Sequence, residues 1–318
     1  MPNQPQEPKM IDFFELIPLP YKQTCITIGN FDGVHLGHQA IIRKMVRHAA
    51  GDKQPVIVIT FFPDPADFFD PERVSFYLTS PSEKNKMLCQ MGVEKVLTFR
   101  FSDKLAELTA REFLSVLVKK LGMKRLVIGR DFALGKGRQG TLPVIQALGQ
   151  EYSFKVDVVE RIDLKTQEVS STRIRQLLAD GQVSEAQVLL GRPYSISGPV
   201  THGSDRGSKI GLPTANIAHW LKKQLPAVGV YATRVYLGEH EYLGVTNVGL
   251  RPTFEDQKQP NVETHILDFD GNIYGEELEL HFVQKIRDEK KFSGVDALLE
   301  QITRDKSTAR KIFSHEPR

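Results

Sequence analysis

Two histidines in a glycine-rich string are the residues best suited to chemistry. Residues 29–38 read GNFDGVHLGH, so His35 and His38 lie three positions apart and follow Gly29 and Gly33. Glycines let the backbone approach a ligand closely. A helix beginning at the end of this string would offer free N–H groups and a positive dipole end to phosphate, and the imidazoles add donors. The string predicts a site that holds a triphosphate and stabilises charge developing at its α-phosphorus.

Two simpler interpretations of this string stay open on the residues alone. His35 and His38 could be a metal-binding pair, although no third ligand is recognisable nearby and the glycines would then have no purpose. They could also be structural histidines at a helix start. The position of the string between an apolar run and an amphipathic helix favours phosphate binding.

A second candidate phosphate site is the segment SSTRIR at residues 170–175. Ser171 and Thr172 could cap a helix, which would be a purely structural role. Arg173 and Arg175 at the same helix start can also bind phosphate. We expect this segment to form a second wall of the ATP site.

A different set of polar residues lies in the second half of the chain. Residues 201–212 are glycine-rich and include Arg206 and Lys209, which suits a loop that closes over phosphates, but no Walker A spacing is present. Thr214 and Asn216 put two neutral oxygen ligands on one side of an extended segment, and Mg²⁺ accepts such ligands beside ATP phosphates. A turn with local asparagine hydrogen bonds is the structural alternative.

Glu263, in the strand-like run VETHIL, is the candidate base of this half. Alternation puts Glu263 and His265 on one face of a strand and Val262, Thr264 and Ile266 on the other. A carboxylate there could accept a proton from an attacking hydroxyl. On its own, however, a glutamate on a strand is usually a solvated side chain.

Apolar runs alternate with helical patterns through the first half. Strands are expected at residues 25–29, 56–62, 93–99, 126–129 and 155–159, and helices at 39–50, 82–92 and 110–121. The helix at 82–92 is expected to turn Glu83 and Lys84 outward. Strands that alternate with helices imply a parallel sheet with covering helices, so an α/β domain is expected over residues 1–186.

The pattern changes near residue 186. Short β-like runs punctuated by glycine, proline and asparagine follow at residues 194–200, 229–237, 242–248, 263–267 and 277–285. Residues 294–313 form one amphipathic helical pattern. We therefore expect an antiparallel β-barrel or sandwich with a C-terminal helix over residues 187–318.

Composition limits the function classes. The chain has 318 residues, 40% hydrophobic residues and a net charge of +3, which suits two globular domains that bind small anions and does not indicate nucleic acid. Cys25 and Cys89 lie in no CxxC motif, which disfavours zinc and disulfide frameworks. No signal peptide is recognisable, and the strongest apolar run, Val56–Phe62, is too short to span a bilayer. These features predict a cytoplasmic protein without a membrane partner and leave the oligomeric state open.

The ordered motifs resemble the prokaryotic bifunctional riboflavin kinase/FMN adenylyltransferase family, also called FAD synthetase. The resemblance covers nearly the whole chain. It is carried by GNFDGVHLGH (29–38), IGRDFALG (128–135), SSTRIR (170–175), GLPTAN (211–216), NVGLRPTF (247–254) and ETHILDFDGNIYG (263–275). It implies a Rossmann-like nucleotidyltransferase domain followed by a riboflavin-kinase barrel. Small molecules are then the expected partners: riboflavin and ATP would give FMN and ADP, and FMN and ATP would give FAD and pyrophosphate, with Mg²⁺ as the cofactor.

The resemblance also implies residue roles. Glu263 would be the base for the riboflavin hydroxyl, and His35 and His38 would act in adenylyl transfer. The residues expected at ATP are Gly29, Phe31, Gly33, His35, His38, Ser171, Thr172, Arg175, Arg206 and Lys209. Those expected near the flavin are Asp131, Phe132 and Arg251, and those expected at Mg²⁺ are Thr214 and Asn216.

Four positions depart from the family pattern. Asp64 stands where the family usually has histidine, Leu134 where an aromatic residue is common, Leu212 where phenylalanine is usual, and Ser208 where arginine is common. Asp64 and Leu134 motivate one alternative, a riboflavin kinase whose adenylyltransferase half is weakened. A second alternative is a flavin- or nucleotide-sensing regulator on the same scaffold. A third is an NAD-type oxidoreductase based on GKGRQG (135–140), although that match is weak and lacks a substrate-side catalytic set.

Overall fold

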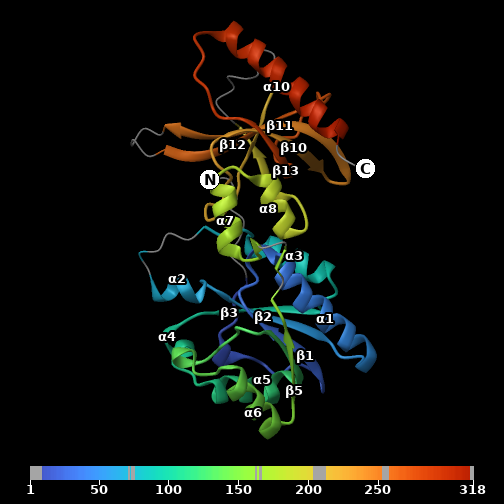
Figure 1. Cartoon of the computed structure of the whole chain (residues 1–318), viewed down its shortest axis with the longest axis vertical. Coiled ribbons are helices and arrows are strands. Elements are labelled where there is room, and N and C mark those ends of the chain that lie inside the picture. Colours follow the sequence, from blue (N-terminus) through green and yellow to red (C-terminus); the bar gives the residue numbers. More distant parts are fainter. Residues whose placement is uncertain are drawn as a thin grey trace. The chain divides into compact units, whose positions relative to one another are not determined.

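The computed structural model describes residues 9–70, 72, 76–161, 163–164, 167–202, 213–252 and 258–315 (Figure 1). The described residues up to Ser171 form one compact unit, and those from Thr172 onward form another. The boundary expected between residues 186 and 187 falls within the helix α8 (Val183–Leu190). Separate folding of the two halves therefore stays a prediction.

The N-terminal unit is built on a five-stranded parallel sheet. Its strands are β1 (Thr24–Ile28), β2 (Val56–Phe62), β3 (Lys95–Arg100), β4 (Met123–Gly129) and β5 (Lys155–Val159). They lie in the order β3-β2-β1-β4-β5, and every neighbouring pair is parallel. The expected parallel sheet is confirmed. The strand order reverses between β1 and β4, and open α/β sheets bind ligands beyond the carboxyl ends of the strands at such a point.

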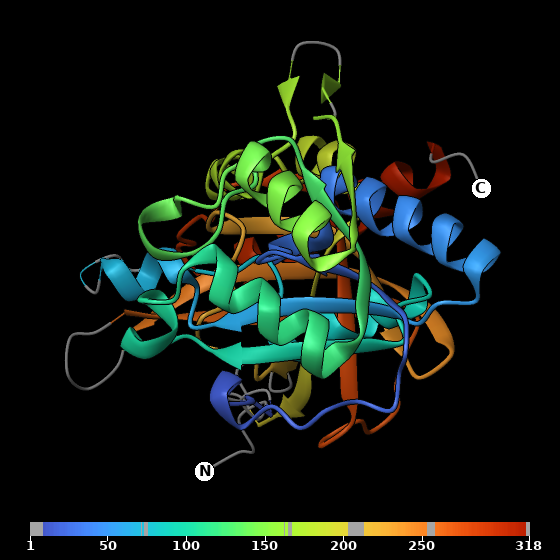
Figure 2. The ribbon, with the colours of Figure 1, turned by 90° about the horizontal axis from the view of Figure 1, so that it is seen from below.

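Helices cover both faces of this sheet. One apolar cluster lies beneath α5 (Ala110–Leu121) and α6 (Leu142–Tyr152), and a second lies beneath α1 (Leu36–Asp52) and α3 (Pro81–Gln90). Figure 2, seen from below, brings α5 and α6 in front of the strands. Shorter elements are η1 (Phe13–Glu15), η2 (Asp32–Val34), α2 (Pro65–Phe69), α4 (Asp103–Ala106), η3 (Lys136–Arg138), β6 (Asp163–Leu164) and β7 (Gln167–Glu168).

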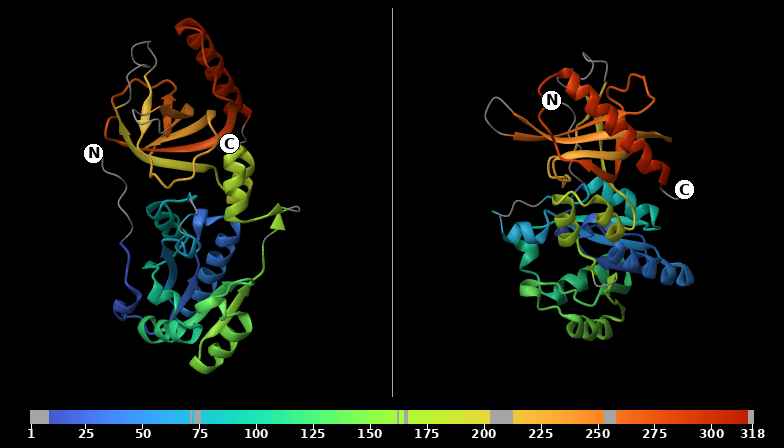
Figure 3. Two further views of the ribbon diagram at one scale, coloured as in Figure 1. Left: turned by 90° about the vertical axis from the view of Figure 1, so that its left-hand side faces the viewer. Right: turned by 45° about the horizontal axis from the view of Figure 1, so that its top comes forward.

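The C-terminal unit is a closed antiparallel barrel (Figure 3). Its strands are β8 (Tyr194–Thr201), β9 (Ala215–Ile217), β10 (Gly229–Leu237), β11 (His240–Pro252), β12 (Lys258–Ile266) and β13 (Glu277–Arg287). They close in the order β10-β11-β12-β9-β8-β13. Closure gives every strand two hydrogen-bonded neighbours, so the sequence-based choice between barrel and sandwich is decided for the barrel. Thr233, Thr246 and Thr264 are fully buried, and their hydroxyls are linked by hydrogen bonds of 2.7 and 2.9 Å.

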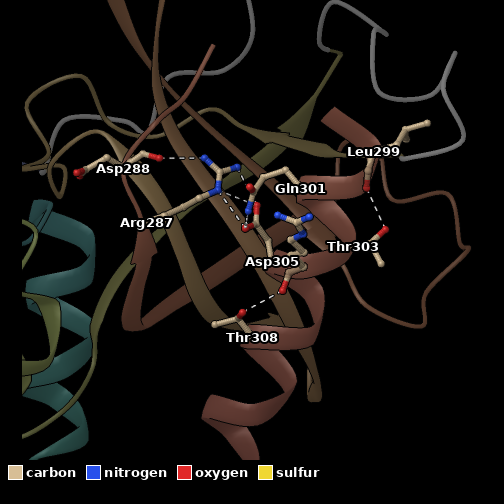
Figure 4. A network of polar contacts seen from close by, with 8 residues as sticks. Arg287, Asp288, Leu299, Gln301, Thr303, Asp305 and Thr308 are labelled. Atoms are coloured by element: carbon tan, nitrogen blue, oxygen red, sulfur yellow. Dashed lines mark hydrogen bonds and ion pairs between the residues drawn. The ribbon is translucent and has the colours of Figure 1, made fainter. Parts of the chain in front are cut away.

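Among the described residues, this part of the chain also contains the helices α7 (Ser171–Ala179), α8 and the C-terminal α10 (Val295–His315). Figure 4 shows how α10 is held to the end of β13. Arg287 donates from Nε and Nη2 to both carboxylate oxygens of Asp305, at 2.8–3.1 Å, and its Nη1 donates to the Asp288 carbonyl at 2.9 Å. Gln301 also donates to Asp305, which is only 2% exposed. The charge of the buried Asp305 carboxylate is thus met by an ion pair and by hydrogen bonds from two side chains, as a buried charge requires.

Candidate active sites

The glycine-rich turn after β1 has an unusual backbone. Phe31, Gly33 and Val34 have φ angles of 53°, 78° and 41°. This left-handed region is costly for side chains other than glycine, and a bulky residue holds it only where the surroundings fix it. Such strain at the switch point of the sheet is consistent with a turn shaped for a ligand.

Hydrogen bonds to neighbouring segments of the chain fix this turn. The Asp32 carboxylate accepts hydrogen bonds from the backbone amides of Leu78 and Thr79, both at 3.1 Å. The Thr79 hydroxyl accepts a hydrogen bond from the Gly33 amide at 3.1 Å, and Ser171 Oγ donates to the Asp32 carbonyl at 2.9 Å. Asp32 is therefore a structural anchor, and Ser171, which the sequence assigned to ATP, contacts the turn directly.

The two histidines form a stacked pair at the start of α1. Their ring centroids are 3.7 Å apart, with planes inclined by 18°. His35 caps the helix, because its Nδ1 accepts a hydrogen bond from the His38 amide at 3.4 Å. In its neutral form His35 then carries its proton on Nε2, which leaves that atom as a donor. Burial, followed by the positive charges of His35 and Lys84, holds the pKa of His38 well below its usual value.

Lys84 corrects one sequence-based expectation. The helical pattern placed it on the outer face of α3, but it is only 8% exposed. Its Nζ donates to the Asn30 carbonyl and to Thr60 Oγ1, both at 2.9 Å. Burial lowers the pKa of Lys84 to about 8, although the charges of Asp32 and Asp64 oppose this shift. The expectation was wrong because a lysine can direct its ammonium to a buried acceptor, which residue polarity does not reveal.

Two cavities lie beside this turn. The larger, of about 770 Å³, has walls of aromatic and aliphatic side chains, among them Phe61, Phe101 and Phe113. The smaller, of about 180 Å³, has several charged side chains on its walls and is lined by His35, His38, Ile41, Gly129, Arg130, Glu160 and Arg161, among others. Asp131 and Phe132 line both cavities, so the two cavities are neighbours that share these residues as part of their walls. The structure thus brings together the histidine turn after β1 and the predicted flavin residues after β4.

Two of the four residues that depart from the family pattern, Asp64 and Leu134, also line the larger cavity. Asp64 accepts a hydrogen bond from Asn30 Nδ2 and caps α2 by accepting from the Ala66 amide at 2.9 Å. Leu134 lies along the same wall. The carboxylate that replaces the usual histidine is therefore part of a hydrogen-bonded arrangement next to the turn.

The glycines of GKGRQG have a packing role. A Cβ atom on Gly135 would lie 2.5 Å from the Ala110 nitrogen, and one on Gly140 would lie 2.6 Å from the Ala110 side chain. The segment must therefore approach the start of α5 closely. This explains a glycine spacing that imitates a dinucleotide-binding fingerprint.

The remaining predicted ATP and flavin residues have separate locations. Thr172 is exposed and Arg175 is half-buried, and both lie on α7 in the second unit. Arg251 lies on β11, where its backbone pairs with Gln259. Arg206 and Lys209, like the variant positions Ser208 and Leu212, lie outside the described residues.

Strand register builds the polar cluster of the barrel. On β12, Glu263 lies opposite Asn216 of β9 on one side and Asn247 of β11 on the other. Its Oε1 accepts a hydrogen bond from Asn261 Nδ2 at 2.8 Å. Val262, Thr264 and Ile266 are buried, whereas Glu263 and His265 are half-buried, so the predicted alternation of faces is confirmed. A carboxylate flanked by two buried or half-buried amides can bind a hydroxyl group and accept its proton.

Thr214 lines a neighbouring cavity of about 230 Å³, together with Pro213, Ala215, Thr264 and Tyr274, among others. The Tyr274 ring stacks on His202 with centroids 3.9 Å apart. Sequence reasoning missed Asn30, Lys84, Asn247 and Tyr274. The first, third and fourth of these lie inside the motif strings, which was a usable signal, whereas Lys84 had none.

The fold and these sites define a two-domain transferase that acts on phosphates: an α/β nucleotidyltransferase-type unit and a barrel with a candidate base. Comparisons with known proteins agree. A family model described as FAD synthetase matches residues 19–173, and one described as riboflavin kinase matches residues 190–313. The bifunctional riboflavin kinase/FMN adenylyltransferase of Escherichia coli (strain K12) is 41% identical over 297 residues, which cover 92% of this chain and 94% of that protein.

Further relatives support the same assignment. The protein of the same name from Haemophilus influenzae is 40% identical, over 91% of this chain and 94% of its own. The chain therefore belongs to the bifunctional riboflavin kinase/FMN adenylyltransferase family, as its motifs predicted. A crystal structure described as a macrolide-efflux protein from Streptococcus pneumoniae is 33% identical, with a TM-score of 0.85 over 94% of this chain and 97% of that one. That description names another activity, so this likeness supports the fold.

Proposed function

We propose that the N-terminal unit transfers AMP from ATP to FMN beside His35 and His38, and that the barrel phosphorylates riboflavin beside Glu263. One observation carries the first assignment. A small cavity lined by both histidines and a larger cavity with aromatic walls share Asp131 and Phe132 at the switch point of the sheet. Two substrates bound in these cavities would meet where the transfer must occur.

In adenylyl transfer, a phosphate oxygen of FMN attacks the α-phosphorus of ATP and pyrophosphate leaves with the electrons of the broken P–O bond. No proton has to be removed from an already ionised phosphate, so the protein contributes position and charge stabilisation. His35 offers Nε2–H to a phosphate, since its Nδ1 already accepts the His38 amide. His38 and the free amides at the start of α1 stabilise the charge that develops in the same place.

The larger cavity suits the isoalloxazine ring. Phe61, Phe101, Phe113 and Phe132 supply flat apolar surface on its walls, and Asp131 supplies a polar edge. Arg251 is proposed as a contact for the flavin in the barrel. Thr172 and Arg175 are proposed to contact ATP in adenylyl transfer.

In the barrel, Glu263 is proposed to accept the proton of the riboflavin 5′-hydroxyl. The oxygen then forms a bond to the γ-phosphorus of ATP, and ADP leaves as that P–O bond breaks. The hydrogen bond from Asn261 orients Oε1 of Glu263 within this cluster. Arg206 and Lys209 are proposed to close over the phosphates.

The side chains at Thr214 and Asn216 fit a magnesium ion. A threonine hydroxyl and an asparagine carbonyl are the neutral hard oxygen ligands that Mg²⁺ takes beside ATP phosphates. Asn216 is only 6% exposed, so its amide is held in place beside Glu263. When bound, the ion would neutralise charge on the transferred phosphoryl group.

Incubation of the pure protein with riboflavin, ATP and Mg²⁺, followed by chromatography of the flavins, tests the whole assignment. FMN followed by FAD is the expected result. FMN alone would support a kinase with a weakened adenylyltransferase half. Binding without any product would support a sensing regulator.

We also propose that the halves fold independently, with the domain boundary near residue 186. A fragment starting at Val188 would cut α8, whose Ser184 donates a hydrogen bond to the Val283 carbonyl of the barrel at 2.9 Å. A fragment starting at Thr172 keeps the whole helix and should be the more stable of the two. Both should phosphorylate riboflavin. If neither is soluble and active, the two-domain assignment fails.

The cellular setting is proposed as the cytoplasm, where ATP is available and where the free cysteines Cys25 and Cys89 would stay reduced. Among the described helices, none is long and apolar enough to cross a membrane. Small molecules are the proposed partners, and no nucleic acid is expected.

A further inference from the structure

The side chain of Lys84 joins three parts of the N-terminal unit. It starts on α3, and its Nζ donates to the Asn30 carbonyl, which belongs to the turn after β1. It also donates to the hydroxyl of Thr60 near the end of β2, and that hydroxyl in turn donates to the Asn30 carbonyl at 3.1 Å. One ammonium group and one hydroxyl thus hold the same peptide oxygen.

A buried ammonium is expensive, which makes this arrangement informative. Removing a charge from water costs far more than two hydrogen bonds to neutral acceptors return. The nearby carboxylates, Asp32 and Asp64, offset part of that cost, yet burial still dominates, since the pKa of Lys84 falls to about 8. An apolar side chain at this position would avoid the cost altogether. Stability alone therefore does not account for a lysine here.

We propose that Lys84 is a positioning residue for adenylyl transfer, whose buried ammonium holds the turn of residues 29–38 through the Asn30 carbonyl. This inference rests on the proposed function of that turn. Asn30 lies between Gly29 and Phe31, where the chain leaves β1 and enters the left-handed backbone. Fixing its peptide fixes the path along which His35 and His38 are delivered to the phosphates.

The charge of Lys84 has a second consequence. The positive groups that act on His38 are His35 and Lys84, while Asp32 and Asp64 face Lys84 from the turn and from the cap of α2. A fixed cation therefore helps to keep the stacked imidazole of His38 neutral. The neutral imidazole is then available as a hydrogen-bond partner.

Lys84→Met tests this inference, because methionine fills similar space without charge or donors. The kcat for FAD formation from FMN should fall by about 10- to 100-fold, because a misplaced transition-state contact lowers kcat. The KM values for FMN and ATP should change by less than about threefold. The titration midpoint of His38, followed by NMR of ¹³C-labelled histidine, should rise. Lys86→Met on the exposed face of α3 is the matched control and should change neither quantity.

Two further measurements separate the possible outcomes. His38→Ala tests the site itself: if that variant still makes FAD, the proposed function of the turn fails, whereas a loss in His38→Ala without a loss in Lys84→Met overturns only the role of Lys84. Lys84→Gln keeps one amide donor and should recover part of the lost kcat. Unfolding of both Lys84 variants would assign the residue to stability and overturn the proposal. Riboflavin phosphorylation should be normal in every folded variant.

Discussion

The two proposed sites are assembled in opposite ways. In the α/β unit, the histidines, the cap of α1 and the left-handed turn all come from one string, residues 29–38. In the barrel, the cluster around Glu263 combines residues of β9, β11 and β12 through strand register. A local string controls geometry by backbone conformation, whereas the barrel controls it by which residues stand opposite one another.

This contrast predicts how each site should respond to change. The first site depends on buried charges and strained backbone, so its chemistry should be sensitive to residues that anchor the turn. The second depends on a closed, hydrogen-bonded barrel, so it should tolerate single substitutions except at the reacting groups. Substitutions in one site should leave the other reaction intact.

The largest effect is expected for Glu263→Gln. Glutamine keeps the size and most hydrogen bonds but cannot accept the hydroxyl proton, so kcat for FMN formation should fall by about 10²–10⁴ with little change in KM. Adenylylation of supplied FMN should be normal. Steady-state kinetics and the melting temperature of the same variant distinguish a general base from a structural residue. A lower melting temperature with retained kcat would show that Glu263 has only a structural role.

His38→Ala should lower the rate of FAD formation by about 10²- to 10³-fold, because it deletes one group that stabilises transition-state charge. His48→Ala is a matched control on the same helix, since that side chain is 39% exposed. Riboflavin phosphorylation measured in parallel should match the unmodified protein. Equal loss of both activities would contradict two independent sites.

Asp305→Ala should strongly destabilise the barrel. It leaves the Arg287 guanidinium buried without its carboxylate, which typically costs about 3–5 kcal/mol. Denaturant unfolding followed through Trp220, the single tryptophan of the chain, reports on this unit. Glu300→Ala, which breaks an exposed pair with Arg304 on the same helix, should cost under about 1 kcal/mol. Similar losses for both variants would show that the network in Figure 4 is no stronger than a surface pair.

The smallest effect concerns pH. The pKa of His38 is lowered in the folded state, so the unfolded chain binds more protons as the pH falls below about 6.5. The free energy of unfolding should therefore fall as the pH is lowered below that value, by at most about 1.4 kcal/mol per pH unit from this group. His38→Gln should flatten the stability curve of the α/β unit, measured by circular dichroism, between pH 7 and 5. An unchanged slope would show that His38 titrates normally.

Much of this protein follows from its sequence. Alternation of apolar runs and helical patterns predicted the parallel sheet, because both faces of such a sheet are covered and its strands read as continuous apolar segments. GNFDGVHLGH was recognisable because glycines, histidines and a helix start are all local features. The alternation around Glu263 was equally readable, since successive residues of a strand point to opposite faces.

Tertiary structure decided what depends on distant partners. The burial of Lys84 results from the way α3 packs beside the turn after β1, and no periodicity marks a lysine that reaches inward. Asp131 and Phe132 can line both cavities only because β4 lies next to β1, which strand order determines. The pairing of Glu263 with Asn216 and Asn247 depends on barrel closure and register, where a shift of one residue would turn every side chain to the other face.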